Sequence, residues 1–385
     1  MKNFLLTTCL AVACTSAMAA EEEGFVPLCN GRDLAGWVNV NCAPETWSVR
    51  EGVIHCTGLP TGAMRTTRQF ENFILELEWR HLTKGGNAGL FLWSTPIAAP
   101  GVPFLRSVEV QVLDHGYAEQ YEKANGKKSD GFTTHGDVFP IHGSTMKPFG
   151  RHNGQRSFPS SDHSKGSPEW NHYRVICTNG VLRLSVNGHE VSGGENCNYR
   201  KGYIGLESEG APVEFRNVRL KELPSSNPPA TLAAPEDTGL RSLFTGLDLR
   251  GWKTNDATAP RWGVRGERLV LRGGTANPEA TLWSEKEFGD AEFVFDCRPA
   301  KPSTGQAVTP PVVVVRGVEV KLTDAVAGGN QRYSVTVQKG EVIVRRGEKE
   351  VQRVTLPAEA KARGPFGLRD IGAALEWMNL YARDL

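Results

Sequence analysis

Residues 30–37 read Asn-Gly-Arg-Asp-Leu-Ala-Gly-Trp, and residues 245–252 read Thr-Gly-Leu-Asp-Leu-Arg-Gly-Trp. In both stretches a Trp-x-Val motif follows, beginning at Trp47 and at Trp262, and the offset between the copies is 215 residues. This repeat predicts two similar modules. All nine histidines lie in the first of them, and imidazole is the side chain that changes its proton state near neutral pH. We therefore expect one working module and one structural module.

Length and composition are those of a soluble, turn-rich protein with two cores. The chain has 385 residues, a net charge of +1 and 39% apolar residues, and this length suffices for two domains. Glycine (42 residues) and proline (23 residues) are abundant, which favours short strands joined by turns. No block of basic residues is interleaved with aromatic ones, so the sequence indicates no nucleic-acid partner.

Residues 1–20 have the pattern of an export signal. Lys2 is followed by an apolar stretch at residues 4–14 and by small residues around Ala19 that suit signal cleavage. We therefore expect an exported protein, either periplasmic or extracellular. The alternative of lipid attachment at Cys14 lacks the larger aliphatic residue that usually precedes such a cysteine. No later segment is apolar enough to be a transmembrane helix.

Six cysteines follow the predicted cleavage site, five in the first module and one in the second. Export permits disulfides, but six cysteines allow 15 pairings, and the sequence does not choose among them. No Cys-x-x-Cys pair is present, so we expect no cysteine-based structural zinc site.

A segment rich in proline, serine and alanine at residues 223–238 predicts a linker. It separates a first module at residues 24–222 from a second module at residues 239–385. The two copies match again near their ends, where the offset falls to 162 residues, so the second copy is shorter by 53 positions. Most of this difference falls after Asp114, where the first module carries an insertion with five histidines.

Both modules consist of short alternating segments separated by turns. Residues 73–79 place large apolar side chains at every second position, and residues 291–296 do much the same. Residues 173–186 read as a hairpin around Asn179-Gly180. No stretch holds a helical period for long. We therefore predict an all-β protein with two β-sandwiches in tandem.

The first candidate site lies on the run Val-Glu-Val-Gln-Val-Leu-Asp-His at residues 108–115. On a strand, alternate side chains share a face. The three valines would then point into the sandwich, Glu109 and Gln111 would point to the opposite face, and Asp114 and His115 would lie where the strand ends. These groups suit a ligand with many hydroxyls. We take Glu109 and Asp114 as catalytic candidates and Gln111 and His115 as substrate-binding candidates.

The alternative for this strand is a solvated outer face without a ligand. The second copy keeps Glu319 but has Lys321 where the first copy has Gln111. This difference favours a special role for the first copy.

The insertion is dense in histidine, aspartate and glycine at residues 132–143. His135 is a catalytic candidate because imidazole can act as an acid or a base near neutral pH. Asp137 and His142 are substrate-binding candidates. The alternative is a polar loop without a role, which we favour for the histidines further along the insertion.

A divalent metal ion is a further hypothesis for the same residues. His135 could bind it together with Glu109 or Asp114. Mixed imidazole and carboxylate ligands would suit zinc or manganese better than calcium.

Residues 85–89 read Gly-Gly-Asn-Ala-Gly and lead into a strand rather than a helix, which argues against a phosphate-binding loop. Asn87 could bind a sugar hydroxyl, and Trp93 could stack on a sugar ring. The alternative is turn chemistry with a core tryptophan.

The first module contains five motifs, at Leu28–Trp37, Gly86–Gly89, Glu109–Asp114, Glu169–Asn171 and Gly202–Asn217. Together and in this order, they resemble the 3-keto-disaccharide hydrolase family, also described as the 3-keto-glucoside 1,2-lyase and 3-keto-2-hydroxy-glucal hydratase domain. The resemblance covers nearly all of residues 25–222, whereas the second copy resembles a diverged member only at its start and end. The insertion after Asp114 is longer than in common members.

The resemblance implies a concanavalin-like jelly roll with a sugar site on its concave face. It also implies elimination from a 3-keto-glycoside, in which a base removes the C2 proton and the C1 substituent leaves, with hydration as a following step. Glu109 and His135 would be the base and the acid in either order. The rival hypotheses are a non-catalytic carbohydrate-binding protein of the same fold and an envelope adhesion or scaffold protein, because fold alone does not define function.

Overall fold

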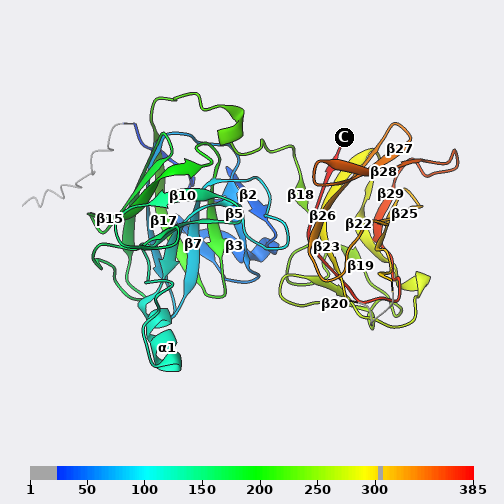
Figure 1. The fold of residues 1–385 in the computed structure, drawn as a ribbon, viewed down its shortest axis with the longest axis horizontal. Helices are drawn as coiled ribbons and strands as arrows, with labels where there is room; N and C mark the ends of the chain where they lie inside the picture. The colour runs from blue at the N-terminus through cyan, green and yellow to red at the C-terminus, as the bar shows by residue number, and fades with distance from the viewer. Residues whose placement is uncertain (1–23, 302–306) are drawn as a thin grey trace, which may run out of the picture.

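The computed structural model describes residues 24–301 and 307–385, and the predicted export signal at residues 1–20 lies outside them. Two antiparallel β-sandwiches stand side by side (Figure 1). The predicted fold class, two concanavalin-like jelly rolls in tandem, is confirmed. Because each sandwich has its own pair of sheets, each buries its own core.

The first sandwich packs a back sheet against a front sheet. The back sheet has, in spatial order, β10 (Thr145–Pro148), β15 (His189–Asn198), β14 (Val181–Val186), β13 (Asn171–Thr178), β6 (Phe73–His81), β17 (Val213–Glu222), β4 (Val53–Cys56) and β3 (Trp47–Arg50), with β1 (Val26–Pro27) paired to β17. The front sheet has β11 (His152–Asn153), β12 (Arg156–Ser157), β9 (Val138–Ile141), β8 (Ser107–Leu113), β7 (Asn87–Ser94), β16 (Tyr203–Ser208), β5 (Gly62–Thr66) and β2 (Trp37–Val40).

The second sandwich is built in the same way. Its back sheet has β20 (Trp262–Val264), β21 (Leu269–Leu271), β30 (Leu375–Asp384), β23 (Ala291–Pro299), β26 (Gln331–Gln338), β27 (Glu341–Arg346) and β28 (Lys349–Thr355), with β18 (Arg241–Ser242) paired to β30. Its front sheet has β19 (Trp252–Lys253), β22 (Leu282–Phe288), β29 (Gly364–Leu368), β24 (Val312–Val315) and β25 (Val318–Lys321).

The two front sheets share one strand order. β19-β22-β29-β24-β25 in the second module repeats β2-β5-β16-β7-β8 in the first. The register agrees as well, since Phe91 lies opposite Glu109 in the first module and Val314 lies opposite Glu319 in the second. The extra elements of the first module, α1 (His115–Asn125) and β9 to β12, lie between β8 and β13, where the sequence predicts the insertion.

Alternation along the strands produces the first core. On β6, Phe73, Leu75, Leu77 and Trp79 are all buried between the sheets. Burying one side chain of this size contributes about 1.5–3 kcal/mol. The predicted Asn179-Gly180 hairpin is present between β13 and β14, and both residues have positive φ angles (53° and 77°), as a tight turn of this kind requires.

One local element is not predicted by the sequence analysis, because α1 is a regular helix of 11 residues. Its apolar period is weak, and its ends stabilise it instead. The Asp114 carboxylate accepts a hydrogen bond from the Gly116 N–H at the N-terminus, and Gly126 takes the left-handed conformation at the C-terminus. Within residues 24–301 and 307–385, no helix has the length and apolar character needed to cross a membrane.

The segment at residues 223–238 follows the surface of the first module. The Arg65 guanidinium lies 2.7 Å from Asp237, and the Gln69 amide donates to the Ala234 carbonyl. Short 3-10 turns occur at Pro44–Thr46, Ala230–Leu232 and Pro278–Ala280. All six cysteines of the described part have free thiols, so no disulfide pairing is assigned.

One contact between the two modules is made by residues 95–106, the segment between β7 and β8, which we call the interface loop. The Tyr381 hydroxyl accepts a hydrogen bond from the Ala98 N–H (3.1 Å), and Asp296 accepts one from the Gly101 N–H (2.8 Å). The Asn379 amide donates to two further carbonyls of this loop. The second module therefore holds a loop that belongs to the first.

Candidate functional site

Strand β8 has the orientation that its alternation predicts. Val108, Val110 and Val112 are fully buried between the sheets. Glu109 and Gln111 point to the outer face of the front sheet, where they line a cavity. The predicted orientation of these side chains is confirmed.

The cavity is an open hollow of about 280 Å³ on this face. Strands β7, β8, β9, β12 and β16 contribute to it, and α1 adds one wall. Its lining residues are Asn87, Phe104, Glu109, Gln111, Leu113, Tyr117, Phe132, Phe139, Ile141, His142, Arg156, Glu207 and Glu209. Acids, amides, an arginine and aromatic rings therefore share one small space, as ligand pockets require.

Three glutamates line the cavity, and we call Glu109, Glu207 and Glu209 the acidic cluster. Glu109 and Glu207 come together because the residue between them, Gly89 on β7, has no side chain. A Cβ atom at Gly89 would lie 2.8 Å from Glu207 Oε2 and 2.9 Å from Glu109 Oε1. No atom occupies that position, so the two carboxyl groups approach each other above the strand.

Burial and mutual repulsion shift the acidic cluster toward its protonated forms. Burial, followed by the charge of Glu209, raises the pKa of Glu109 to about 8. Burial raises the pKa of Glu209 to about 7. Burial and the charges of its two neighbours hold the pKa of Glu207 well above its usual range. Near neutral pH the cluster therefore holds both protonated and ionised carboxyl groups.

Two amides orient this cluster. The Asn87 amide donates a hydrogen bond to Glu209. The Gln111 amide in turn donates to the Asn87 side-chain carbonyl over 2.9 Å. Among the hydrogen bonds of the described residues, neither Glu109 nor Glu207 has an amide partner, so Glu209 is the member of the cluster that the amides hold.

A single guanidinium, that of Arg156 on β12, supplies positive charge to the cavity. It donates to Asp137 over 2.9 Å and lies 3.4 Å from the centre of the Phe139 ring. Asp137 is fully buried behind it, and burial raises the pKa of this carboxyl despite the bonds from Thr133 and Arg156. Asp137 thus holds Arg156 in place and does not line the cavity itself.

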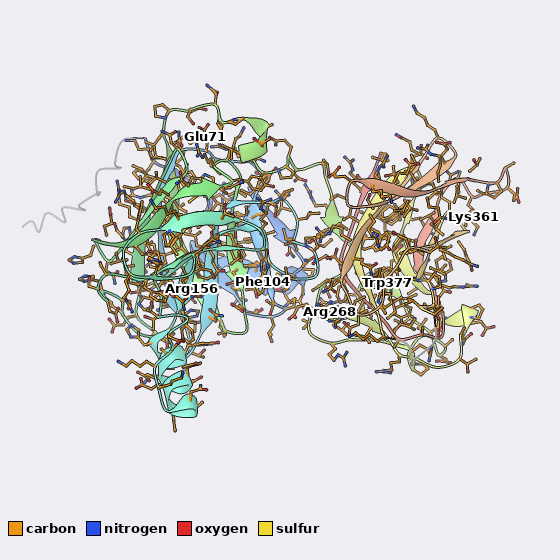
Figure 2. The ribbon with its side chains drawn as sticks, viewed as in Figure 1. Glu71, Phe104, Arg156, Arg268, Lys361 and Trp377 are labelled. Carbon is orange, nitrogen blue, oxygen red and sulfur yellow. The ribbon has the colours of Figure 1, made fainter. Side chains whose placement is uncertain are left out.

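His142 stands at the far wall and stacks on Phe104, with ring centres 5.7 Å apart and planes only 6° apart. Burial lowers the pKa of His142, so the ring is neutral near neutral pH. Figure 2 shows Arg156 and Phe104 in the first module, with Phe104 nearer the second module and its Arg268. Phe104 belongs to the interface loop, so this wall is built on the contact between modules.

The structure does not bring every candidate into the cavity. Asn87, Glu109, Gln111 and His142 line it, whereas Asp114, His115 and His135 lie behind the end of β8. The Trp93 ring is buried in the core, and its N–H donates to the Glu71 carbonyl. No sugar can stack on it there.

Asp114 acts as a backbone anchor. Its carboxylate accepts hydrogen bonds from the N–H groups of Gly85, Gly116 and Ser167 at 2.7–2.8 Å. Burial raises its pKa, but these three bonds outweigh that effect and the pKa is lowered. An ionised carboxylate with this many backbone partners fixes the end of β8.

Three residues of the site, Arg156, Glu207 and Glu209, lie outside the set that the sequence analysis selects. A signal for the two acids is present in the sequence. At the offset of 162 residues, the second copy has Arg369 and Ile371 at the positions of Glu207 and Glu209. This change between the copies is a sequence difference that could have drawn attention to both positions.

A larger cavity of about 450 Å³ lies on the back sheet of the first module. Its acids are neutralised, since Glu76 is paired with Arg174 and Arg219, and Glu78 is paired with Arg216. The hollow on the front sheet is therefore the better candidate site, because its acids are not neutralised in this way.

A jelly roll with acids, amides and an arginine in one open hollow has the groups that a hydroxyl-rich ligand would need. The comparison with known families agrees. Residues 24–221 match the 3-keto-alpha-glucoside-1,2-lyase-like domain, and the chain belongs to this family. The match ends before the second module, so its descent from a diverged copy stays a prediction.

Individual relatives are distant. A 3-keto-disaccharide hydrolase of Bacteroides thetaiotaomicron is 24% identical, and the match covers 54% of this chain and 81% of that protein. A candidate glycosyl hydrolase from Parabacteroides distasonis is 19% identical, with 52% of this chain and 95% of that one covered and a TM-score of 0.41. A carbohydrate-binding module from Bacillus subtilis is 14% identical, with 49% and 96% covered and a TM-score of 0.34.

Proposed function

We propose that the first module cleaves 3-keto-glycosides by removing the C2 proton and eliminating the C1 substituent, with water adding afterwards to complete a net hydrolysis. The observation that carries this proposal is the acidic cluster, in which carboxyl groups of raised pKa face one arginine. Family membership and the 3-keto-disaccharide hydrolase among the relatives support the substrate class.

The chemistry needs a base, an acid and a positive charge. A ketone at C3 acidifies the C2 proton, and an ionised carboxylate of the cluster removes it. The electron pair moves onto the C3 oxygen, where the Arg156 guanidinium stabilises the negative charge. The ketone then re-forms, a C1–C2 double bond forms and the C1–O bond breaks. A protonated carboxyl group supplies the proton that the leaving oxygen takes.

Within the cluster, Glu209 is our candidate for the base and Glu109 for the acid. Asn87 donates a hydrogen bond to Glu209, and with a pKa of about 7 this carboxyl group is partly ionised at neutral pH. The pKa of Glu109 is about 8, so Glu109 is largely protonated at neutral pH and has a proton to give to the leaving oxygen. His135 is no longer our acid candidate, since it does not line the cavity.

The decisive experiment compares Glu109→Gln with the matched control Glu319→Gln in the second module, using a 3-keto-glucoside and the plain glucoside. We expect Glu109→Gln to lower kcat at least about 100-fold, because general acid–base catalysis commonly contributes this much. Glu319→Gln should retain full activity. Elimination is followed by the absorbance of the enone product.

Other results would contradict the proposal. Full activity in a folded Glu109→Gln variant would exclude Glu109 from the reaction. Equal binding of both sugars without turnover in the wild-type protein would identify a carbohydrate-binding protein, and no binding of either would favour a scaffold.

We also propose that the protein is exported, a proposal supported by the basic start, apolar stretch and small residues of positions 1–20. Mass spectrometry of the periplasmic or secreted protein should give a mature chain that begins near Glu21. An intact N-terminus on a cytoplasmic protein would contradict export.

A further inference from the structure

Two histidines and an aspartate meet at the rim of the first sandwich, outside the cavity. His115 opens α1, His135 lies in the segment between α1 and β9, and Asp162 lies in the segment between β12 and β13. One ligand atom of each lies within 4.8 Å of the other two. Three separate segments thus contribute ligands to one point.

His135 is prepared to act as a ligand. Its Nδ1 lies 2.8 Å from the Leu113 carbonyl, which can only accept, so Nδ1 carries the hydrogen and Nε2 has a free lone pair. Nε2 is buried and has no hydrogen-bond partner among the described residues.

The other two ligands surround this lone pair. Asp162 Oδ1 lies 3.9 Å from His135 Nε2, and Asp162 Oδ2 lies 3.4 Å from His115 Nε2. The Ser164 N–H donates to Asp162 over 2.9 Å and so fixes its carboxylate. The rings of His115 and His135 have centres 4.9 Å apart, which brings both imidazoles to the same carboxylate.

We propose that His115, His135 and Asp162 bind one divalent transition-metal ion, for which zinc is the best match. Two imidazoles and a carboxylate are ligands that zinc accepts, and three protein ligands leave a fourth position for water. The Leu113 carbonyl would orient the His135 ring as such outer partners commonly do. Ligand atoms around tetrahedral zinc lie about 3.4 Å apart, so small side-chain movements would complete the site.

The metal would fasten the wall of the neighbouring cavity. Leu113, which holds His135, lines that cavity, and so do Tyr117 on α1 and Phe132, just before the His135 turn. The Tyr117 and Phe132 rings pack edge to face with centres 5.7 Å apart. The ion would join the segments that carry them.

The test measures metal binding to the full chain, without a histidine tag and after treatment with a chelator, so it does not depend on the proposed reaction. Calorimetric titration with Zn²⁺ should give one ion per chain, and Tm of the first module should rise by about 5 °C at 100-fold excess over Kd. Co²⁺ should give the visible absorption of a tetrahedral site.

Variants assign the ligands. His115→Ala and Asp162→Asn change partly exposed side chains, so they should fold, and each should weaken Zn²⁺ binding at least about 10-fold. The control His189→Ala removes an exposed histidine that stacks on His163 and should bind Zn²⁺ normally. Absence of heat and of a Tm shift in the wild-type protein would overturn the proposal, as would unchanged binding in His115→Ala or an equal loss in His189→Ala.

Discussion

The two front sheets have the same strand order but opposite arrangements of charge. In the first module, Glu109 and Glu207 approach each other above Gly89. In the second, the matching register puts Val312 at the position of Gly89. There Glu319 forms a 3.0 Å salt bridge with Arg369, the residue at the position of Glu207.

This difference separates the residues that stabilise a front sheet from those that a reaction would require. A valine and an ion pair complete the surface of the second front sheet at little energetic cost. The first module instead keeps a gap and three acids that repel one another, which costs stability. Such a cost in stability is typical of a functional site. Single substitutions can test each difference between the two modules in turn.

The largest effect should come from filling the gap. Gly89→Val, which copies the second module, would place a side chain within 3 Å of two carboxyl groups. We expect kcat to fall by about 100-fold or more, because a misplaced reacting group costs this much, while the far-UV circular dichroism spectrum stays unchanged. Val312→Gly is the reverse control and should leave turnover as it is. Normal activity of Gly89→Val would contradict the geometry of the cluster.

A second effect concerns stability and pH. The pKa of Glu109 is about 8 in the folded protein and about 4.5 when unfolded, so its ionisation opposes folding. The free energy of unfolding should therefore decrease as pH rises from about 4.5 to 8. Glu109→Gln should be more stable than the wild type at pH 9 by on the order of 2 kcal/mol, as measured by urea denaturation.

The same measurement at pH 4 should show a much smaller difference, since Glu109 is then protonated in both states. Glu319→Gln provides the comparison and should leave the pH dependence unchanged. A wild-type free energy of unfolding that does not vary between pH 5 and pH 9 would mean that folding does not raise the pKa of Glu109.

A smaller effect should come from the contact between modules. Tyr381→Phe removes the hydroxyl that accepts the Ala98 N–H, at a cost of about 1 kcal/mol. Because the interface loop carries Phe104 to the cavity, we expect KM to rise about 2- to 5-fold with kcat nearly constant. Steady-state kinetics of the variant measure both constants. An unchanged KM would show that the interface loop does not affect substrate binding.

The smallest effect should come from the ion pair of the second module. Arg369→Gln breaks a partly exposed salt bridge, and such pairs are worth about 0–1 kcal/mol. We expect a fall in Tm of at most about 2 °C and no change in activity. A loss of turnover in this variant would show that the second front sheet takes part in the chemistry.

The sequence predicts the two sandwiches and the orientation of Glu109 and Gln111 because both follow from local alternation. The position of His135 does not follow in this way. Its place behind β8 depends on a turn after α1 and on packing against the Trp79 ring, both of which are tertiary effects. The α1 helix escapes prediction for a related reason, since its end caps stabilise it rather than an apolar period.

Through the interface loop, both modules determine the shape of the cavity. Its walls are covalently part of the first sandwich, yet Asp296 and Tyr381 hold one of them from outside. Thermodynamic linkage makes this coupling reciprocal. If association of the two sandwiches raises the affinity for a sugar by some factor, the bound sugar must strengthen that association by the same factor. The second module, which has no histidine, would therefore change the affinity of the first module for sugar.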